Sequence, residues 1–455
     1  MATQRFDVVV LGAGSAGERC SVLLARRGRS VAMVEEALVG GVCPYLACIP
    51  SKALLRPAHI DAEASAVPGI GAIQIDPGPL LSWRDELVHG LDDTHRVSRL
   101  DKEGIALVRG RGRLDGPMRV VVGSADTVLE ATEAVIVATG AEAVRPPIDG
   151  LDAVEYLTSD ELTVLAEVPD RLTMVGGGII GCELSQAFAA LGTHVTLIHE
   201  AGQVLDTHEP AAGRLVGAAL EGMGVEMVLG EPVNRVRQDG DEVVVQLPSG
   251  ARHRAGRLAI AVGRRPRLHG IGLETAGIDP DAPEIDGSFR TPSGVFIAGD
   301  ASAEGMFTHM ANAQADVVVT ALVGDGRRSI NDAIAGARSP SVVFTAPQVS
   351  TVGIRSSDAP EGSVSVEVDL ARTAAAATMG RDVGGAMVGV FAADGTIIGA
   401  TFVGPTVGEM LHAATIAVAN RLTVEQLALA IPPFPTLSGI WDVLIAQVRE
   451  RLAAD

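Results

Sequence analysis

Lysine is almost absent from this chain, in which Lys52 and Lys102 are the only two. With 36 basic and 56 acidic residues the formal net charge is -20, which argues against nucleic acid or an anionic membrane surface as a partner. The sequence also lacks an uncharged apolar run of membrane-spanning length, and no signal-peptide pattern precedes the first apolar run at 6–11. We therefore expect a cytoplasmic protein without a membrane partner.

Cysteine is scarce as well, with four residues in 455. Cys43 and Cys48 lie in the run 40–52, Gly-Gly-Val-Cys-Pro-Tyr-Leu-Ala-Cys-Ile-Pro-Ser-Lys, with a helix-stopping proline in the loop between them. A disulfide closing so short a loop would stabilise the fold by only about 2 kcal/mol. Zinc usually needs four ligands, and Cys20 and Cys182 each stand alone in other motifs. In a cytoplasmic protein, such a pair is more typical of a redox-active dithiol, and Lys52 one turn later strengthens that hypothesis.

Two segments share one pattern: a buried strand, a glycine turn, a helix, and a second strand with a polar residue at its end. The first has strands at 6–11 and 31–34 around Gly12, Gly14 and Gly17, and the second has strands at 172–175 and 195–198 around Gly176, Gly178 and Gly181. The glycines permit the tight turn, the approach of backbone to a pyrophosphate, and close packing of helix on strand. Two matches in the correct context predict that the chain holds two dinucleotides.

The ends of the second strands suggest how each ribose is recognised. Glu35 lies 21 residues after Gly14, where a carboxylate accepts hydrogen bonds from ribose hydroxyls. The second unit ends in His199-Glu200 without an arginine. A 2′-phosphate would meet Glu200 rather than a cation, so we expect NADH to be favoured over NADPH.

Further segments predict strands that reach a glycine near a cofactor, at 134–140, 259–264 and 291–300. A Pro-Pro pair at 146–147, followed by Gly150, indicates a joint between domains. From about Ser339 the pattern changes to alternating strands, such as 364–368 and 388–392, followed by Ala-rich helices. This last part is predicted to be a separate domain.

Together these motifs resemble the class I pyridine nucleotide-disulfide oxidoreductases, the family of dihydrolipoamide dehydrogenase, glutathione reductase and mercuric reductase. The resemblance covers essentially the whole chain and rests on motifs in order: both glycine turns, the CxxxxCxPSK run, Ala138-Thr139-Gly140, Gly299-Asp300 and Val-Val-Phe-Thr-Ala-Pro at 342–347. It implies an α/β fold with two Rossmann-like dinucleotide-binding domains and a C-terminal α+β dimerisation domain. The expected boundaries are 1–149 and 267–338 for the FAD-binding domain, 150–266 for the NAD(P)-binding domain and 339–455 for the interface domain.

The resemblance also implies roles for individual residues. FAD would be held in the first unit, and NADH or NADPH in the second, by the six turn glycines together with Glu35, Lys52, Thr139, Gly140, Asp300, Met306, His309, Glu200, Gly263 and Arg264. Cys48 would be the thiol next to the flavin and Cys43 the thiol that meets a small-molecule substrate. Lys52 would lie near the flavin, paired with Glu183. A thiolate at Cys48 would be favoured both by a helix start and by Lys52. Family members are homodimers in which each subunit completes the other's active site.

One motif departs from the family. Its closing sequence His-x-His-Pro-Thr-x-x-Glu corresponds here to residues 432–439, where Phe434 replaces the catalytic His and Gly439 replaces the Glu that holds it. No histidine follows His412. Losing a positioned acid or base typically costs roughly 10²- to 10⁴-fold in rate, and a phenylalanine makes the site drier.

Several functions remain open. The leading hypothesis is a flavoprotein thiol/disulfide oxidoreductase whose substrate carries its own proton source or needs none. A second is reductive thioether cleavage, with or without carboxylation, because the chain resembles 2-ketopropyl coenzyme M oxidoreductase/carboxylase in carrying Phe in place of the His, although Gly439 and Lys52 fit it less well. A third is a diaphorase that reduces quinones without the thiols, and others are a decayed reductase and a redox-sensing or scaffolding subunit. Metal-ion reduction is disfavoured, because the C-terminal cysteine pair of mercuric reductase is missing.

Overall fold

The chain folds into two compact units, each built from separate stretches of sequence. The computed structural model describes residues 2–71, 73–123, 127–324 and 329–453. The first unit comprises Met1–Pro50, Asp85–Ala143 and Arg264–Ala337, and the second comprises Ser51–Arg84, Val144–Gly263 and Arg338–Asp455. The helices α3 (Cys48–Ala66) and α4 (Pro77–Leu87) contain two of the points where the chain passes from one unit to the other, and the other three follow Ala143, Gly263 and Ala337.

The first unit is organised around a mostly parallel sheet in the order β3-β2-β1-β6-β5-β4, with β16 beside β6. Its strands are β1 (Ala2–Leu11), β2 (Val31–Glu35), β3 (Ala106–Arg109), β4 (Gly112–Leu114), β5 (Arg119–Val122), β6 (Thr127–Val137) and β16 (Phe296–Ile297). β1 is parallel to both β2 and β6. The sequence shows this as an unbroken apolar run because a central parallel strand is buried on both faces.

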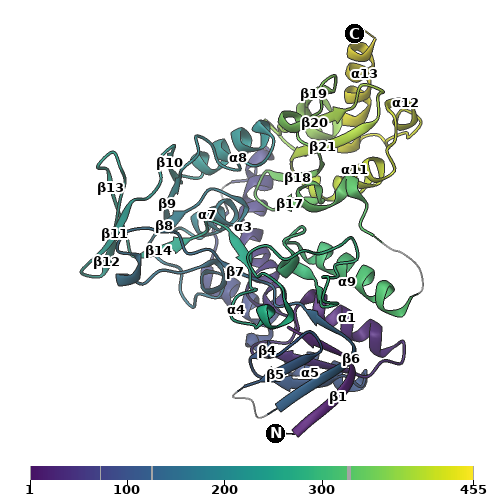
Figure 1. Cartoon of the computed structure of the whole chain (residues 1–455). Helices are drawn as coiled ribbons and strands as arrows, with labels where there is room; N and C mark the ends of the chain where they lie inside the picture. The colour runs from purple at the N-terminus through teal and green to yellow at the C-terminus, as the bar shows by residue number, and fades with distance from the viewer. Residues whose placement is uncertain (1, 72, 124–126, 325–328, 454–455) are drawn as a thin grey trace. The chain divides into compact units, whose positions relative to one another are not determined.

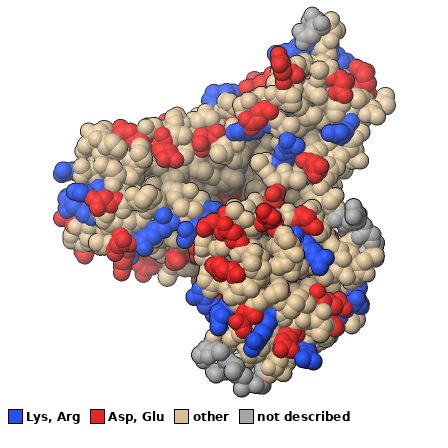
Figure 2. Space-filling view, in the orientation of Figure 1, with Lys and Arg blue, Asp and Glu red and all other residues tan. Residues whose placement is uncertain are grey.

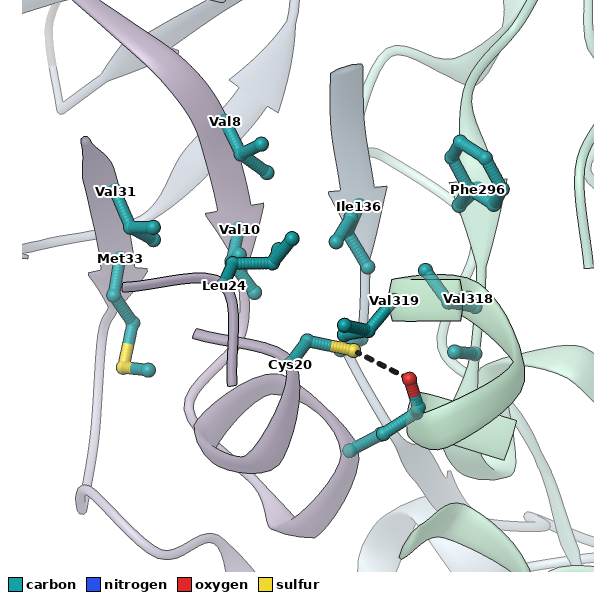
Figure 3. Packing of buried hydrophobic residues seen from close by; sticks show 14 of the residues in the cluster. Val8, Val10, Cys20, Leu24, Val31, Met33, Ile136, Phe296, Val318 and Val319 are labelled. Atoms are coloured by element: carbon teal, nitrogen blue, oxygen red, sulfur yellow. Dashed lines mark hydrogen bonds between the residues drawn. The ribbon is translucent and has the colours of Figure 1, made fainter. Parts of the chain in front are cut away.

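Helices cover this sheet and complete its core. They are α1 (Ser15–Ala25), α2 (Val42–Tyr45), α5 (Thr94–Lys102) and α9 (Thr308–Val323), and a small ladder pairs β7 (Ala141–Ala143) with β15 (Arg264–Pro266). α1 packs against α9. Figure 3 shows side chains of β1, β2 and β6 meeting those of the two helices, with Cys20 among them.

The second unit begins with a smaller parallel sheet in the order β10-β9-β8-β14. Its members are β8 (Arg171–Val175), β9 (His194–His199), β10 (Glu226–Leu229) and β14 (Arg257–Ile260), with helices α6 (Ser159–Leu162), α7 (Ile179–Ala190) and α8 (Pro210–Gly222) and an antiparallel ladder of β11 (Arg235–Asp239), β12 (Glu242–Gln246) and β13 (Arg252–Ala255). Figure 1 shows β8 and β9 next to α7. The strand, glycine turn, helix and strand predicted twice from the sequence are therefore present twice.

The C-terminal part of the second unit is an antiparallel sheet in the order β17-β18-β21-β20-β19. Its strands are β17 (Ser341–Val343), β18 (Gln348–Gly353), β19 (Val364–Asp369), β20 (Ala386–Phe391) and β21 (Ile397–Gly404), and its helices are α10 (Ala374–Met379), α11 (Leu411–Ala419), α12 (Val424–Leu427) and α13 (Ile440–Leu452). This mixed α/β fold agrees with the predicted class, whereas the predicted domain boundaries stay predictions. No helix among the described residues has the length and apolarity to cross a membrane.

Acidic and basic side chains are interspersed over the face shown in Figure 2. Many charged side chains of the described residues form ion pairs, such as Arg19 with Asp316 and Arg254 with Glu242. Exposed pairs of this kind contribute about 0–1 kcal/mol each to stability. The excess of acidic residues is therefore a property of solubility rather than of fold.

Three local expectations were wrong. The strand predicted at 259–264 ends at Ile260, and Arg264 begins β15, because Gly263 takes a left-handed φ of 123° between them. The strand predicted at 291–300 is reduced to the two residues of β16. Pro44 does not lie in a loop: it is inside the single-turn helix α2, where proline is tolerated because the first N–H groups of a helix have no internal partner.

Candidate functional site

The first glycine turn has the shape of a phosphate cradle. A Cβ at Gly12 would lie 2.3 Å from the carbonyl oxygen of Ala138, and one at Gly17 would lie 2.0 Å from that of Gly12. A Cβ at Gly14 would meet nothing within 4 Å. Two glycines are thus required for packing, and the third faces open space at the start of α1, where the helix dipole favours an anion.

The second turn repeats this geometry. A Cβ at Gly176 would lie 2.4 Å from the Ala261 carbonyl oxygen and one at Gly181 would lie 1.8 Å from that of Gly176, whereas Gly178 faces open space before α7. The residues present in both turns therefore fit the pyrophosphate of a dinucleotide.

Glu35 holds the first turn from the end of β2. Its Oε2 accepts a hydrogen bond from the Ala13 amide at 2.7 Å, and its Oε1 accepts one from the Ala37 amide at 2.7 Å. A carboxylate has about four lone-pair positions, so capacity remains for ribose hydroxyls. Glu35, the residue predicted to bind ribose, therefore has a carboxylate fixed by two backbone amides beside the first glycine turn.

The cysteine segment is tied to the same turn. The Gly40 amide donates to the carbonyl of Ala13 at 2.8 Å. Gly41, with φ of 69°, approaches so closely that a Cβ on it would lie 2.8 Å from Cα of Gly14. Side chains are thus excluded where the start of α2 crosses the glycine turn, and this contact fixes the approach of Cys43 within the first unit.

Two helix N-termini meet at Cys48. This residue is the first of α3, and its Sγ lies 3.7 Å from Oγ1 of Thr308, the first residue of α9. Both helix dipoles favour a thiolate there. Cys43 and Cys48 are both partly buried.

The other two cysteines lie in apolar cores. Cys20 and Cys182 are both 0% exposed. Burial raises the pKa of Cys20 to about 12 and raises that of Cys182 as well. Both are therefore inert structural thiols, and Figure 3 shows Cys20 pointing toward the carbonyl of Ala315.

Lys52 and Glu183 form the ion pair that the sequence suggested. The Nζ of Lys52 lies 2.8 Å from Oε2 of Glu183, whose side chain is 4% exposed. The other oxygen of Glu183 accepts from the Phe344 amide at 2.7 Å, and the ammonium lies 4.7 Å from the centroid of the Phe344 ring. Both oxygens of the buried carboxylate thus have a partner, and the pairing holds the ammonium of Lys52 in position.

The remaining residues predicted to contact cofactor lie in both units. Thr139 donates to the Arg267 carbonyl at 2.7 Å, and Arg264 donates to the Ala141 carbonyl at 2.9 Å. Gly140 and Gly263 have left-handed φ values and open space at the Cβ position. Met306 is exposed, and the ring of His309 stacks on Phe307 with centroids 5.5 Å apart. Phe307 and His309 lie on either side of Thr308 in the sequence, and Thr308 contacts Cys48.

Asp300 is a carboxylate in an unfavourable environment. Burial raises its pKa, and the charge of Arg264 only partly offsets this. A buried carboxylate that lacks full compensation in the protein is well suited to accept hydrogen bonds from a hydroxylated ligand chain.

Replacing Asp300 by Asn is expected to stabilise the apoprotein. Because the folded-state pKa of Asp300 is raised, its carboxyl favours folding only at low pH, and this contribution is lost as pH rises through that pKa. The variant should therefore raise the Tm of the apoprotein by about 2–4 °C at pH 8 and by less at pH 4. Thermal unfolding at both pH values, with the exposed Asp241→Asn as the control, checks this, and an unchanged Tm at pH 8 would contradict it.

The tail that departs from the expected motif is exposed. Phe434 is 86% exposed, and its neighbours Leu429 and Ile431 are 80% and 89% exposed. A Cβ on Gly439 would meet nothing within 4 Å. The single chain therefore offers an apolar segment, with no acid or base in the two positions where the motif would place them.

A residue pair in the second unit was missed from the sequence. His199, not Glu200, ends β9 as Glu35 ends β2, and its Nε2 lies 3.2 Å from Oδ1 of Asp206. Glu200 is exposed in the following turn. Counting 21 residues from Gly178, as from Gly14 to Glu35, would have located His199.

The loop that carries Asp206 also contains His208. The pKa of His208 is lowered to about 4 by burial and by the nearby charge of Arg355, with Asp206 acting in the opposite direction. Glu209 next to it accepts from the amide and the hydroxyl of Ser356, both at 2.6 Å. At neutral pH, His208 is therefore an uncharged side chain within this loop.

We expect acid to destabilise the second unit through His208. Because its folded-state pKa lies below the unfolded value, the unfolded chain binds more protons between about pH 6.5 and pH 4, so stability falls as pH falls through that window. For a half-buried side chain the loss is on the order of 2 kcal/mol. Urea unfolding from pH 4.5 to 7.5 measures it. His208→Gln should flatten the profile and the exposed His412→Gln should not; equal slopes in all three proteins would count against this assignment.

Comparison with known proteins agrees with the geometry. The family model described as pyridine nucleotide-disulphide oxidoreductase matches residues 6–315, and the model of the dimerisation domain of the same family matches residues 339–444. The chain belongs to the pyridine nucleotide-disulphide oxidoreductase family. This membership makes it an FAD-dependent oxidoreductase that uses a pyridine nucleotide, and it includes the family's dimerisation domain.

The relatives of this chain are named for different enzyme activities. A mercuric reductase of Bacillus cereus is 31% identical over 447 residues, covering 95% of this chain and 70% of the relative. A dihydrolipoyl dehydrogenase of Thermus scotoductus is 32% identical over 466 residues, covering 98% of each. Among solved structures, the HOCl-induced flavoprotein disulfide reductase RclA from Escherichia coli has a TM-score of 0.85 at 25% identity, covering 97% of this chain and 99% of that one. Substrate therefore differs among the relatives while the framework is shared.

Proposed function

We propose that this protein passes electrons from NAD(P)H through Cys43 and Cys48 to a sulfur-containing small molecule whose reduction does not need a His-Glu acid/base pair. The observation that carries the proposal is the position of Cys48, at the first residue of α3 and 3.7 Å from the first residue of α9. A redox thiolate at this position is favoured by the dipoles of both helices, which supports the proposal.

The cysteines perform the exchange in two steps. When bound, FAD would supply the two-electron chemistry that links hydride donation by the nicotinamide to reduction of a Cys43–Cys48 disulfide. The thiolate of Cys43 then attacks one sulfur of a substrate disulfide and releases the other as a thiolate. Cys48 next attacks the sulfur of Cys43, which re-forms the protein disulfide and releases the second substrate thiolate. Two electrons have moved to the substrate, and two protons complete the products.

This protein differs from the expected motif in the group that supplies those two protons. In the motif, the histidine at the Phe434 position would supply them. With Phe434 and Gly439 there, they come from water or from the substrate itself. A substrate whose thiolate is already a stable leaving group suits such a site best, because its release needs no proton.

We assign Lys52 and Glu183 to the transfer of electrons from NAD(P)H to the flavin rather than to the protonation of the product thiolates. The pair keeps a fixed positive charge four residues after Cys48 in α3. We propose that this charge lies beside the flavin and favours hydride transfer. We further propose that NADH is preferred, and that the protein is a homodimer in which the partner subunit completes each site; the dimerisation domain and the exposed Phe434 support this.

Reductive thioether cleavage is the second candidate, and Phe434 favours it. An apolar side chain in place of an acid keeps a carbanion from being protonated, which carboxylation requires. Quinone reduction without the thiols is a third candidate. One similar solved structure is a Cu(II) complex of RclA from Escherichia coli. The described part of this chain contains no group of three or more His, Cys, Asp or Glu residues placed to hold a metal.

The proposal is tested by turnover of the holoenzyme under anaerobic conditions. NADH and NADPH are each offered with a panel of aromatic disulfides, aliphatic disulfides, thioethers with and without carbon dioxide, and quinones. We expect aromatic disulfides, whose thiolates leave readily, to react faster than aliphatic ones by roughly 10-fold or more. Turnover of quinones alone would contradict the proposal, and turnover of thioethers alone would replace it by the second candidate.

A further inference from the structure

The two dinucleotide units differ at the position that reads ribose. In the first unit Glu35 ends β2 and its carboxylate contacts the amide of Ala13, the middle of the glycine turn. In the second unit the corresponding strand β9 ends at His199 and the corresponding turn residue is Gly177. The strand registers agree, since Gly12 donates to the Val34 carbonyl and Gly176 donates to the Ile198 carbonyl.

The imidazole of His199 lies directly on the second turn. A Cβ on Gly177 would lie 2.8 Å from Cγ and Cδ2 of His199, so only glycine allows the ring to sit there. The His199 side chain is mostly buried, with 12% of its surface exposed. Its outer nitrogen Nε2 lies 3.2 Å from Oδ1 of Asp206, and because a carboxylate only accepts, the imidazole donates.

The loop after β9 returns to bring Asp206 to this place. The Leu205 amide donates to the Gly177 carbonyl at 2.8 Å, and Leu205 is 0% exposed with a left-handed φ of 51°. Asp206 follows directly and its side chain is 43% exposed. The carboxylate is thus anchored beside the turn by its neighbour, oriented by His199 and open to a ligand.

We propose that Asp206, positioned by His199, is the carboxylate that recognises the adenosine ribose of the nicotinamide cofactor and selects a free 2′-hydroxyl over a 2′-phosphate. This assignment rests on the proposed binding of NAD(P)H in the second unit and replaces Glu200, which has the expected charge but lies one residue beyond the position equivalent to Glu35. In the first unit one side chain both contacts the turn and carries the carboxylate. In the second unit His199 contacts the turn and Asp206 carries the carboxylate.

The charges around the loop agree with selection against phosphate. Asp206 and Glu200 are both exposed and acidic. Arg355 is a cation close to this loop, where its charge acts on His208, and it is paired with Asp358 at 2.8 Å. A 2′-phosphate would therefore approach a carboxylate, whereas a ribose hydroxyl could donate to it.

The test uses the holoenzyme and two ligands that lack nicotinamide, ADP-ribose and 2′-phospho-ADP-ribose, measured by calorimetry, with kcat and KM for NADH and NADPH as a second readout. Wild-type protein should bind ADP-ribose more tightly. Asp206→Asn should lower the preference for ADP-ribose by roughly 10-fold or more and change KM rather than kcat. Glu200→Gln, the matched control in the same loop, should change the preference by less than about 2-fold.

A double variant tests positioning against simple structural damage. His199→Glu combined with Asp206→Asn places a carboxylate where Glu35 has it, and should restore most of the preference, whereas His199→Ala alone should lower it. Tighter binding of the phosphorylated ligand by wild-type protein, or a larger effect of Glu200→Gln than of Asp206→Asn, would overturn the assignment. Because neither ligand transfers electrons, these outcomes are separate from the fate of the proposed thiol chemistry.

Discussion

Replacing Phe434 by His together with Gly439 by Glu should accelerate the reduction of disulfides by roughly 10²- to 10⁴-fold, the usual contribution of a positioned acid or base. Phe434 is 86% exposed in the single chain and Gly439 has open space at its Cβ position, so both new side chains fit without repacking. The largest gain is expected for aliphatic disulfides, because their thiolates leave slowly without a proton. The measurement is kcat/KM with NADH for a matched aromatic and aliphatic pair.

A control in the same segment separates acid catalysis from a general effect of added polarity. Leu429 is 80% exposed in the same segment, so Leu429→His adds an imidazole of similar exposure away from the motif position. It should leave the rates within about 2-fold. If the double variant behaves like Leu429→His, the missing histidine does not limit turnover and the proposed role of Phe434 is wrong.

Removing Cys43 should abolish disulfide reduction and spare quinone reduction. Cys43→Ala deletes the thiol that attacks substrate, so we expect a loss of at least roughly 10³-fold with disulfides. Electron transfer to a quinone does not need that thiol and should change by less than about 3-fold. Cys20→Ala, which removes a buried thiol from the core of the first unit, is the matched control for cysteine loss and should affect neither activity.

The comparison of the two activities distinguishes the candidate functions. Equal retention of both activities in Cys43→Ala would show that the thiols are idle and that the protein is a diaphorase. Equal loss of both would place Cys43 in electron entry rather than in exchange with substrate. Only a selective loss agrees with the proposed order of electron transfer.

Much of the fold could be predicted because its central strands are buried on both faces. The apolar runs of β1 and β8, followed by glycine turns, are local signals with local causes. The break between β14 and β15 could not be predicted, because the run from Ala259 is apolar throughout and the change of direction depends on the φ of Gly263. Pro44 misled for a similar reason: as part of the first turn of a helix it costs no hydrogen bond.

The site was predicted unevenly for physical reasons. The Lys52–Glu183 pair was suggested by its motif, and the structure adds the Phe344 amide that uses the second carboxylate oxygen. His199 and Asp206 were missed because their contact needs a loop that returns to Gly177, which sequence alone does not show. Glu200 was predicted to contact the ribose because it lies at a strand end, and this stays a prediction. The spacing of 21 residues from Gly178 instead marks His199, the residue at which β9 ends.

The most direct test of the central claim counts thiols before and after reduction by NADH. Air-oxidised holoenzyme is treated anaerobically with NADH, quenched in denaturant with an alkylating reagent, and examined by mass spectrometry for each cysteine peptide. The buried Cys20 and Cys182 are internal standards that should be alkylated in every sample. We expect Cys43 and Cys48 to be unmodified before NADH is added and alkylated after it. Alkylation of both before NADH is added, or of neither afterwards, would contradict this expectation.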